Sequence, residues 1–228
     1  MKCIQSYAVT ECNAGSDLAN VKTTAELKKD HWVLNGSKAW ITNAGIANWY
    51  FVLARTASSP QAKAAEAFTG FVVERDSEGI RIGNKESLMG QRCSDTRSIL
   101  IENVRVPAEN VVGAVGQGFQ LALKAFDRTR PIIASLACGL TKRALDEAGV
   151  YAVERKTFGK RIGEHEGIGF KLADMAMRLE AAKQLAYVAA SKVDSKADDA
   201  SQFSSMAKCF ASEQAFDAVV NAVQASAV

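Results

Sequence analysis

The sequence predicts an α+β protein: a small β-barrel-like domain over residues 1–110, followed by an incomplete antiparallel helix bundle over residues 111–228. Three observations support this. Short runs with alternating polarity fill the first half, turn residues separate those runs, and helical periodicity begins soon after Pro107. Because strands and helices are segregated along the chain, α+β is favoured over an α/β fold.

Eight runs in the first half alternate between apolar and polar residues, as half-buried strands do. Asn35-Gly36, between two of them, is a dipeptide typical of a tight hairpin. Many short strands at this spacing favour a small barrel or sandwich, because closure leaves few exposed edges. The runs cover residues 4–11, 21–27, 31–34, 39–42, 50–56, 68–74, 80–83 and 98–106.

A glycine-spaced segment, Gly113–Gly118, leads into the helical half. It lacks the context of a Walker loop or a dinucleotide fingerprint, and we interpret it as a domain hinge with a helix start. In the first helix Arg130 falls on the apolar stripe, directly before Pro131. Such a local conflict tends to mark function, but an internal ion pair with Asp127 would also explain the charge.

The second and third helices show clear faces. The second has a seam suited to antiparallel packing, made of Ile168, Leu172, Met175, Leu179, Ala182, Ala186, Ala189 and Val193. The third, over about residues 199–223, is expected to bury Phe203, Met206, Phe210, Phe216 and Val220.

Composition narrows the function classes. The 228 residues are 48% hydrophobic and 23% charged, which is ordinary for a soluble globular protein. A net charge of +3 is too small to indicate nucleic-acid binding. Five scattered cysteines without a Cys-x-x-Cys pair favour free thiols in a reducing compartment over disulfides or a metal site. We see no membrane-length apolar run and no targeting segment.

Two stretches in the β half combine hydroxyls with aromatic residues. Residues 7–17 alternate as a strand up to Val9 and then become a polar loop containing Thr10 and Ser16. A strand-to-loop edge of this kind can present hydrogen-bond donors to a flat polar ring or a phosphate, although an ordinary polar turn has the same composition. Trp40–Asn43 again places an aromatic residue and a hydroxyl in a strand.

A basic segment lies between the first two helices. Arg155–Arg161 carries four cations around Thr157 and Phe158, with His165 shortly after. The segment could grip an anion such as a pyrophosphate with Phe158 beside a ring, or it could be a solvated basic loop. A lone histidine at a helix start is more often a cap or a surface residue.

Taken together, five stretches resemble the acyl-CoA dehydrogenases. Their order along the chain and their residues are most similar to the medium-chain members of mitochondrial fatty-acid β-oxidation. The resemblance runs from about Tyr7 to Gln224. The stretches are Tyr7–Asp17, Trp40–Asn43, Met89–Thr96, Phe126–Pro131 and Glu154–Lys160.

The resemblance implies an oxidoreductase that binds FAD and acts on an acyl-CoA. In this family a glutamate removes the α-proton of the thioester while the β-hydrogen leaves as hydride to flavin N5. The family also implies a homotetramer built as a dimer of dimers, an electron-transfer flavoprotein as electron acceptor, and the mitochondrial matrix as location.

Site residues follow from the resemblance by position. Thr10 would lie at the polar edge of the flavin ring, Trp40 would cover the ring and Thr42 would hydrogen-bond near N5. The basic segment would reach the FAD of a neighbouring subunit. The implied cofactor positions are Tyr7, Val9, Thr10, Ser16, Trp40, Ile41, Thr42, Arg155, Thr157, Phe158 and His165. The implied substrate positions are Ser16, Phe126, Asp127, Thr129 and Arg130.

Departures from the family pattern lead us to expect a fragment without a catalytic residue. The N-terminal helical domain is missing, and the glutamate of most members lies beyond Gln224, where the sequence diverges. Some relatives place that glutamate at the position of Thr129, which is not a base at neutral pH. Cys12 replaces a usual proline, and Glu166 a common glutamine. The alternatives are a truncated isoform that binds flavin or subunits without turnover, and a helical interaction protein that has lost the cofactor.

Overall fold

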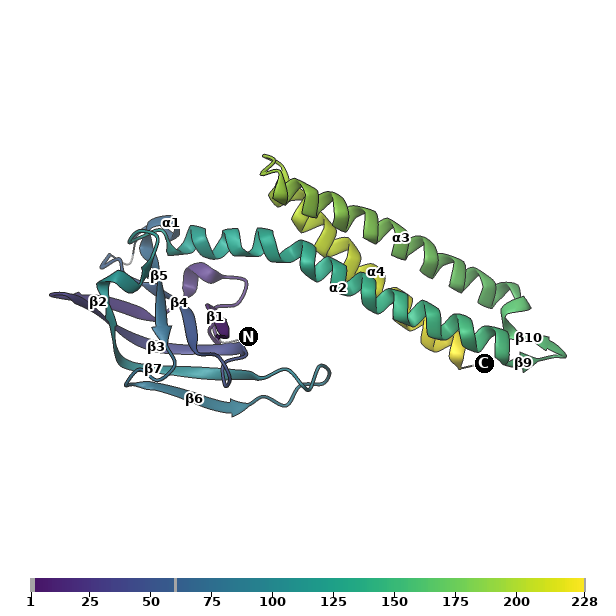
Figure 1. Ribbon diagram of the computed structural model, residues 1–228, viewed down its shortest axis with the longest axis horizontal. Coiled ribbons are helices and arrows are strands. Elements are labelled where there is room, and N and C mark those ends of the chain that lie inside the picture. The colour runs from purple at the N-terminus through teal and green to yellow at the C-terminus, as the bar shows by residue number, and fades with distance from the viewer. Residues whose placement is uncertain (1–2, 60, 228) are drawn as a thin grey trace. The chain divides into compact units, whose positions relative to one another are not determined.

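The computed structural model describes residues 3–59 and 61–227. They form a β unit and a helical unit, and the division falls after Leu123, inside the long helix α2 (Figure 1). The α+β class and the order of the two parts are therefore confirmed.

The β unit is one mixed sheet in the order β6-β7-β3-β2-β4-β5-β8, with β1 added parallel to β4. In this order β6 and β8 are the two ends, so strand pairing among the described residues does not close a ring. Figure 1 shows β4 and β5 crossing β3, β6 and β7. The strands are β1 Gln5–Ala8, β2 Thr24–Lys28, β3 His31–Thr42, β4 Trp49–Arg55, β5 Phe68–Glu74, β6 Ile80–Lys85, β7 Thr96–Pro107 and β8 Val111–Val112. Short helices cover Leu18–Asn20, Ala64–Ala67 (α1) and Ala108–Asn110.

An apolar core lies inside this curled sheet. Leu34 of β3, Tyr50 of β4, Phe71 of β5 and Ile99 of β7 are all fully buried in it. The Tyr50 hydroxyl donates to the Ala44 carbonyl at 2.8 Å, so the polar atom of this large core residue is satisfied. The alternating patterns thus point their apolar sides to a common interior.

The predicted hairpin at Asn35-Gly36 is wrong. β3 runs unbroken from His31 to Thr42, so the predicted runs 31–34 and 39–42 belong to one strand. Its pairing with β7 shifts register between Leu34 and Gly36 and again between Lys38 and Ile41. A Cβ atom on Gly36 would overlap the main chain at Thr23. The glycine therefore permits a close approach of two strands in a bulge, and it does not turn the chain.

The glycine segment before α2 is packed against β5, which corrects its interpretation as a hinge. The Gly116 amide donates to the Thr69 hydroxyl at 3.0 Å. A Cβ atom on Gly118 would lie 2.5 Å from the Gly70 nitrogen. The helix start predicted there is confirmed, because α2 begins at Gly118.

The long helices are α2 Gly118–Glu154, α3 Glu166–Asp194 and α4 Ala200–Ser226. The helical unit consists of α3, α4 and the part of α2 that follows Leu123. A hairpin of β9 Lys156–Thr157 and β10 Lys160–Arg161, then a short helix Ile162–Glu164, connects α2 to α3. The seam predicted on α3 is confirmed: its buried members are Ile168, Met175, Leu179, Ala182, Ala186 and Ala189.

The inward face predicted for α4 is wrong. Its buried residues are small: Ser204, Ala207, Ala211, Ala215, Ala218 and Ala225. Of the large apolar residues expected inside, Met206, Phe210, Phe216 and Val220 are exposed and Phe203 is half-buried. Small side chains let α3 and α4 approach closely, so the alanine face packs and the bulky face points outward.

Candidate functional site

The two aromatic-hydroxyl stretches of the β unit lie side by side. The Ala39 amide donates to the Thr10 carbonyl at 2.9 Å, and the Ser6 hydroxyl donates to the Thr42 carbonyl. Residues 6–10 therefore run next to residues 39–42 over their whole length. We refer to Thr10, Trp40 and Thr42 as the rim.

Trp40 occupies an unusual backbone position. It lies at the second register shift of β3, with φ 59°, in the left-handed region that large side chains rarely adopt. Its side chain is 58% exposed. Bulges near functional sites re-aim a side chain, and backbone strain of this kind persists only where the surroundings hold it. The bulge presents a large aromatic surface on the outer side of the sheet.

The rim hydroxyls are accessible, whereas two of the predicted cofactor positions face the core. Thr42 is exposed and Thr10 half-buried. Val9 and Ile41 are 1% and 2% exposed, because each is an inward position next to an outward one. Any ligand contact from Val9 or Ile41 must therefore come from the main chain.

Tyr7 connects the rim strand to the start of α2 inside the β unit. Its hydroxyl donates to the Ala122 carbonyl at 3.0 Å, and its ring stacks on Phe51 with centroids 5.3 Å apart. Burial raises the pKa of the Tyr7 hydroxyl, so the group is neutral. The ring remains partly exposed beside the rim.

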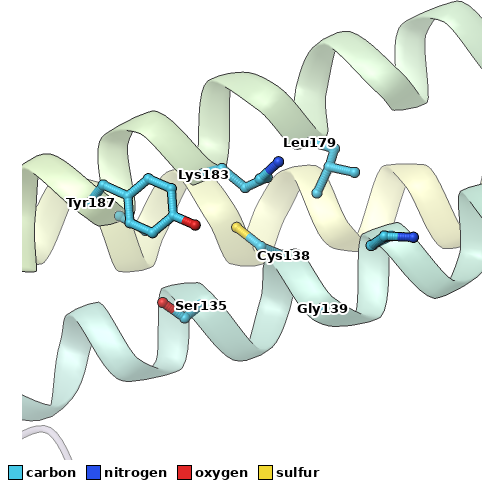
Figure 2. Close-up of a pocket in the computed structure, with 8 residues that line it drawn as sticks. Ser135, Cys138, Gly139, Leu179, Lys183 and Tyr187 are labelled. Atoms are coloured by element: carbon cyan, nitrogen blue, oxygen red, sulfur yellow. The ribbon is translucent and has the colours of Figure 1, made fainter.

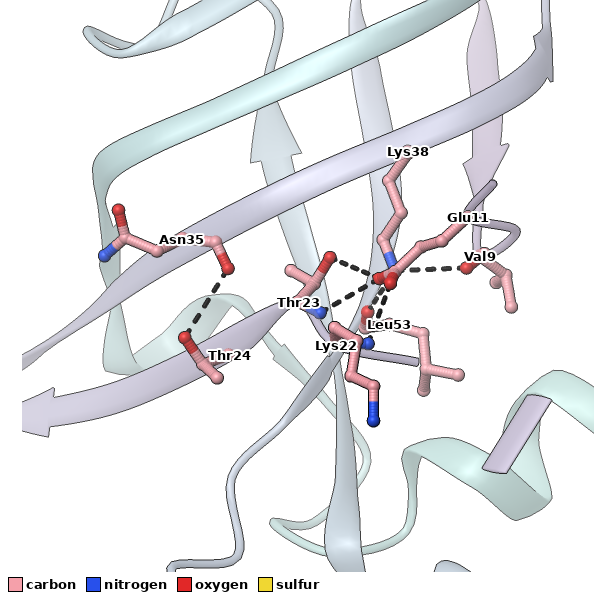
Figure 3. Close-up of polar contacts among 8 residues, drawn as sticks. All are labelled: Val9, Glu11, Lys22, Thr23, Thr24, Asn35, Lys38 and Leu53. Carbon is pink, nitrogen blue, oxygen red and sulfur yellow. Dashed lines mark hydrogen bonds and ion pairs between the residues drawn. The ribbon is translucent and has the colours of Figure 1, made fainter. Parts of the chain in front are cut away.

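A buried ion pair between Lys38 and Glu11 adjoins the rim residues along the chain, and the sequence patterns did not reveal it. Figure 3 shows the pair with its partners. Lys38 Nζ donates to Glu11 Oε1 at 2.9 Å and to the carbonyls of Val9 at 3.0 Å and Leu53 at 2.7 Å. The Lys38 side chain is fully buried. Burial lowers the pKa of Lys38 to about 8, while the Glu11 carboxylate acts in the opposite direction. Three acceptors for three ammonium protons fit a charged lysine at neutral pH.

The loop after Glu11 is a compact polar turn. Glu11 and Ala14 exchange two main-chain hydrogen bonds of 3.1 Å each. Beyond this turn Ser16 is exposed, and Cys12 is exposed within it. The simple-turn interpretation thus describes residues 11–14, while Ser16 is accessible to a ligand.

In the helical unit, Asp127 and Arg130 form the internal ion pair considered from the sequence. Arg130 Nη1 lies 2.9 Å from Asp127 Oδ1. The pair is anchored on α4, because the Ser201 hydroxyl donates to Asp127 at 2.9 Å and Arg130 donates to Ser205 at 3.1 Å. The Arg130 guanidinium lies 5.9 Å from the centre of the Phe126 ring. Thr129, in the same turn, is exposed.

The basic segment forms a hairpin that displays Phe158. Phe158 and Gly159 have φ of 51° and 79°, which shape a tight turn between β9 and β10. Phe158 is 95% exposed, and its ring meets His165 edge-on at 6.1 Å. His165 Nε2 also lies 3.2 Å from the Thr157 hydroxyl. The histidine therefore supports the hairpin that carries the aromatic residue.

A cavity of about 180 Å³ lies between α2 and α3 (Figure 2). Cys138, Leu179 and Tyr187 contribute to its mainly apolar wall. Cys138 is buried, and burial raises the pKa of its thiol. The described residues contain no group of three or more His, Cys, Asp or Glu that could hold a metal ion. Within the same residues, no helix combines the length and apolar character that a membrane span requires.

Family comparison agrees with this architecture. The middle-domain model of acyl-CoA dehydrogenases matches residues 6–104, and the C-terminal-domain model matches residues 116–226. The chain belongs to the acyl-CoA dehydrogenase family. Members of this family are oxidoreductases.

Three relatives illustrate the similarity. A probable medium-chain specific acyl-CoA dehydrogenase of Caenorhabditis briggsae, named as mitochondrial, is 53% identical over 191 residues, which is 84% of this chain and 47% of that protein. Butyryl-CoA dehydrogenase of Megasphaera elsdenii has a TM-score of 0.93 at 37% identity, covering 98% of this chain and 57% of that chain. PigA, solved as an FAD complex, has a TM-score of 0.92 at 28% identity, covering 98% and 57%. The chain spans about half the length of the curated relatives it matches.

Proposed function

We propose that this chain is the flavin-binding part of an FAD-dependent acyl-CoA dehydrogenase of fatty-acid β-oxidation, and that the rim receives the flavin ring. The observation that carries the proposal is Trp40, an exposed aromatic residue in a strained bulge beside two threonine hydroxyls. A flat, partly apolar ring with a polar edge fits such a surface, because the indole can cover its face while hydroxyls meet its edge.

Each of the three rim residues has a role in this proposal. Thr10 and Thr42 bind and orient the polar edge of the ring, and Trp40 covers it and excludes water. When bound, FAD supplies the acceptor for the hydride lost from the acyl-CoA as a base removes the α-proton. Donors fixed in advance stabilise charge that develops during such a reaction. Among the described residues we assign no catalytic base.

Residues of the helical unit have roles that rest on the family resemblance. Phe126, Asp127 and Arg130 would contact the acyl-CoA, and the hairpin around Phe158 would reach the FAD of a second subunit. The exposure of Phe158 and of the cations around it supports this, because an exposed ring and basic side chains are accessible to a flat, anionic cofactor held by another subunit. The dimer of dimers, the electron-transfer flavoprotein acceptor and the mitochondrial matrix belong to the same proposal.

The direct test is flavin binding by the purified chain. We expect FAD fluorescence to be quenched on titration with the chain, and the affinity to fall at least tenfold in Trp40→Ala. Replacing Thr42 with Val should also weaken binding, whereas Thr24→Val, which removes an exposed hydroxyl from β2, should not. Equal affinity in the wild type, Trp40→Ala and Thr42→Val would refute the placement of the ring.

Addition of octanoyl-CoA under anaerobic conditions tests the assignment of the base. Because no described residue is assigned that role, the FAD-loaded chain should keep its flavin absorbance. A positioned base typically contributes about 10²- to 10⁴-fold to such a reaction. Rapid bleaching would show that a residue of this chain removes the α-proton.

A further inference from the structure

We propose that Lys38 and Glu11 are positioning residues, whose buried ion pair holds the Thr10 strand edge against the Trp40 bulge and so keeps the rim in its binding shape. The inference rests on the proposed function of the rim as the flavin surface. Neither side chain reaches the outer face, so both act through other residues.

The pair connects four separate segments of the β unit. Lys38 extends from β3 to the Val9 carbonyl and to the Leu53 carbonyl on β4. Glu11 accepts from the main-chain amides of Lys22 at 2.7 Å and Thr23 at 3.0 Å, and from the Thr23 hydroxyl at 2.5 Å. Figure 3 shows these contacts converging on one point. Every donor of the ammonium and both carboxylate oxygens have partners, so the network is fully satisfied.

The position of the pair in the sequence links it to the rim. Glu11 follows Thr10 directly, and Lys38 stands two residues before Trp40, at the edge of the register shift. Between them the Ala39 amide donates to the Thr10 carbonyl. A left-handed tryptophan is unfavourable by itself and needs surrounding contacts to fix it. The ion pair supplies such contacts on both strands at once.

Stability alone does not account for a pair of this kind. Burying two charges removes their hydration, and well-packed apolar residues in their place are often as stable or more stable. What an apolar pair cannot reproduce is the set of directed bonds to Val9, Leu53 and Thr23. The structure therefore favours a role in fixing geometry.

The test begins with rim geometry in the absence of flavin. The chain is labelled with 5-fluorotryptophan, and the Trp40 signal in the fluorine NMR spectrum is assigned from its loss in Trp40→Phe. We expect Lys38→Met to shift or broaden the Trp40 signal, with Glu11→Gln as a milder second variant that retains side-chain volume. Lys28→Met is the matched control, because it removes an exposed ion pair to Glu26, of 2.8 Å, in the same sheet. The control should leave the spectrum unchanged.

A second control separates positioning from general weakening. Val104→Ala makes a cavity in the core of the β unit. Val104 pairs with Leu34, which lies on β3 six residues before Trp40. At an equal decrease in melting temperature, Lys38→Met should alter the Trp40 signal and weaken FAD binding at least tenfold relative to Val104→Ala. Equal effects in the two variants would overturn the inference. If only the ion-pair variants alter the Trp40 signal, the positioning role is supported. If in addition the wild-type chain binds no FAD, the proposed function is refuted while the positioning role stands.

Discussion

A methyl group added to α2 should lower stability at one glycine, Gly118, and raise it at another, Gly139. At Gly118 the new Cβ would lie 2.5 Å from the Gly70 nitrogen and 2.7 Å from Thr69 Cα. These are main-chain atoms of β5, and Gly70 is paired on both sides, so they cannot give way cheaply. Overpacking of this kind costs about 1–3 kcal/mol. Gly139 has no atom within 4 Å of its Cβ position, so alanine there should gain about 0.5–1 kcal/mol of helix propensity.

The assay can observe each unit separately. All three tryptophans, Trp32, Trp40 and Trp49, belong to the β unit, so their fluorescence follows its unfolding, whereas circular dichroism at the helical band follows mainly the helices. At roughly 4 °C per kcal/mol for a unit of this size, Gly118→Ala should lower the fluorescence transition by about 4–12 °C. Gly139→Ala should raise the helical transition by roughly 2–4 °C. A neutral Gly118→Ala would refute the packing of α2 on β5.

Three other predictions concern the helical seam, the ion pair and the hairpin. Met175→Ala should lower the free energy of unfolding of the helical unit by about 2–5 kcal/mol in urea titrations, since the side chain is fully buried; a loss below about 1 kcal/mol would contradict its seam position. Burial raises the pKa of Glu11, but the Lys38 ammonium and the hydrogen bond from Thr23 outweigh burial and lower the pKa overall. The ionised carboxylate therefore stabilises the fold above the ordinary pKa of 4.5, and this stabilisation is lost as the pH falls. The stability deficit of Glu11→Gln should therefore shrink from pH 7 to about pH 3, and a constant deficit would exclude this linkage. Phe158→Ala should leave stability within about 0.5 kcal/mol yet weaken FAD retention, and unchanged retention would argue against a cofactor contact.

Periodicity predicted most elements of the fold but failed where main-chain geometry departs from regular repeats. Asn35-Gly36 reads as a turn because that dipeptide commonly adopts left-handed conformations. In β3 the same glycine instead removes a side chain so that Thr23 can approach. A single sequence gives no measure of how close a second strand comes, so the bulge and the turn cannot be told apart from the dipeptide.

Thr10, Trp40 and Thr42 could be singled out from the sequence because they carry their chemistry locally, whereas the ion pair next to them could not. Thr10, Trp40 and Thr42 attract attention as hydroxyl and aromatic residues at strand positions. Lys38 and Glu11 are 27 residues apart, and charged residues in strands are usually outward-facing. The second register shift on β3 follows Lys38, so simple alternation across this segment misassigns inward and outward positions. The one signal that could have indicated the pair is that each of the two aromatic-hydroxyl stretches has a charged residue close by, Glu11 after Thr10 and Lys38 before Trp40.

Helix α4 shows a separate limit of pattern analysis. Helical spacing identifies which residues share a face, but it does not say which of two apolar faces packs inward. Hydrophobicity favours the face with Phe210 and Phe216, yet the facing seam of α3 offers Ala182, Ala186 and Ala189, which suit close contact between backbones. The alanines of α4, such as Ala211, therefore meet them, and Phe216 remains 70% exposed. The choice of face depends on side-chain size on the partner helix, so it must be argued for the pair of helices together.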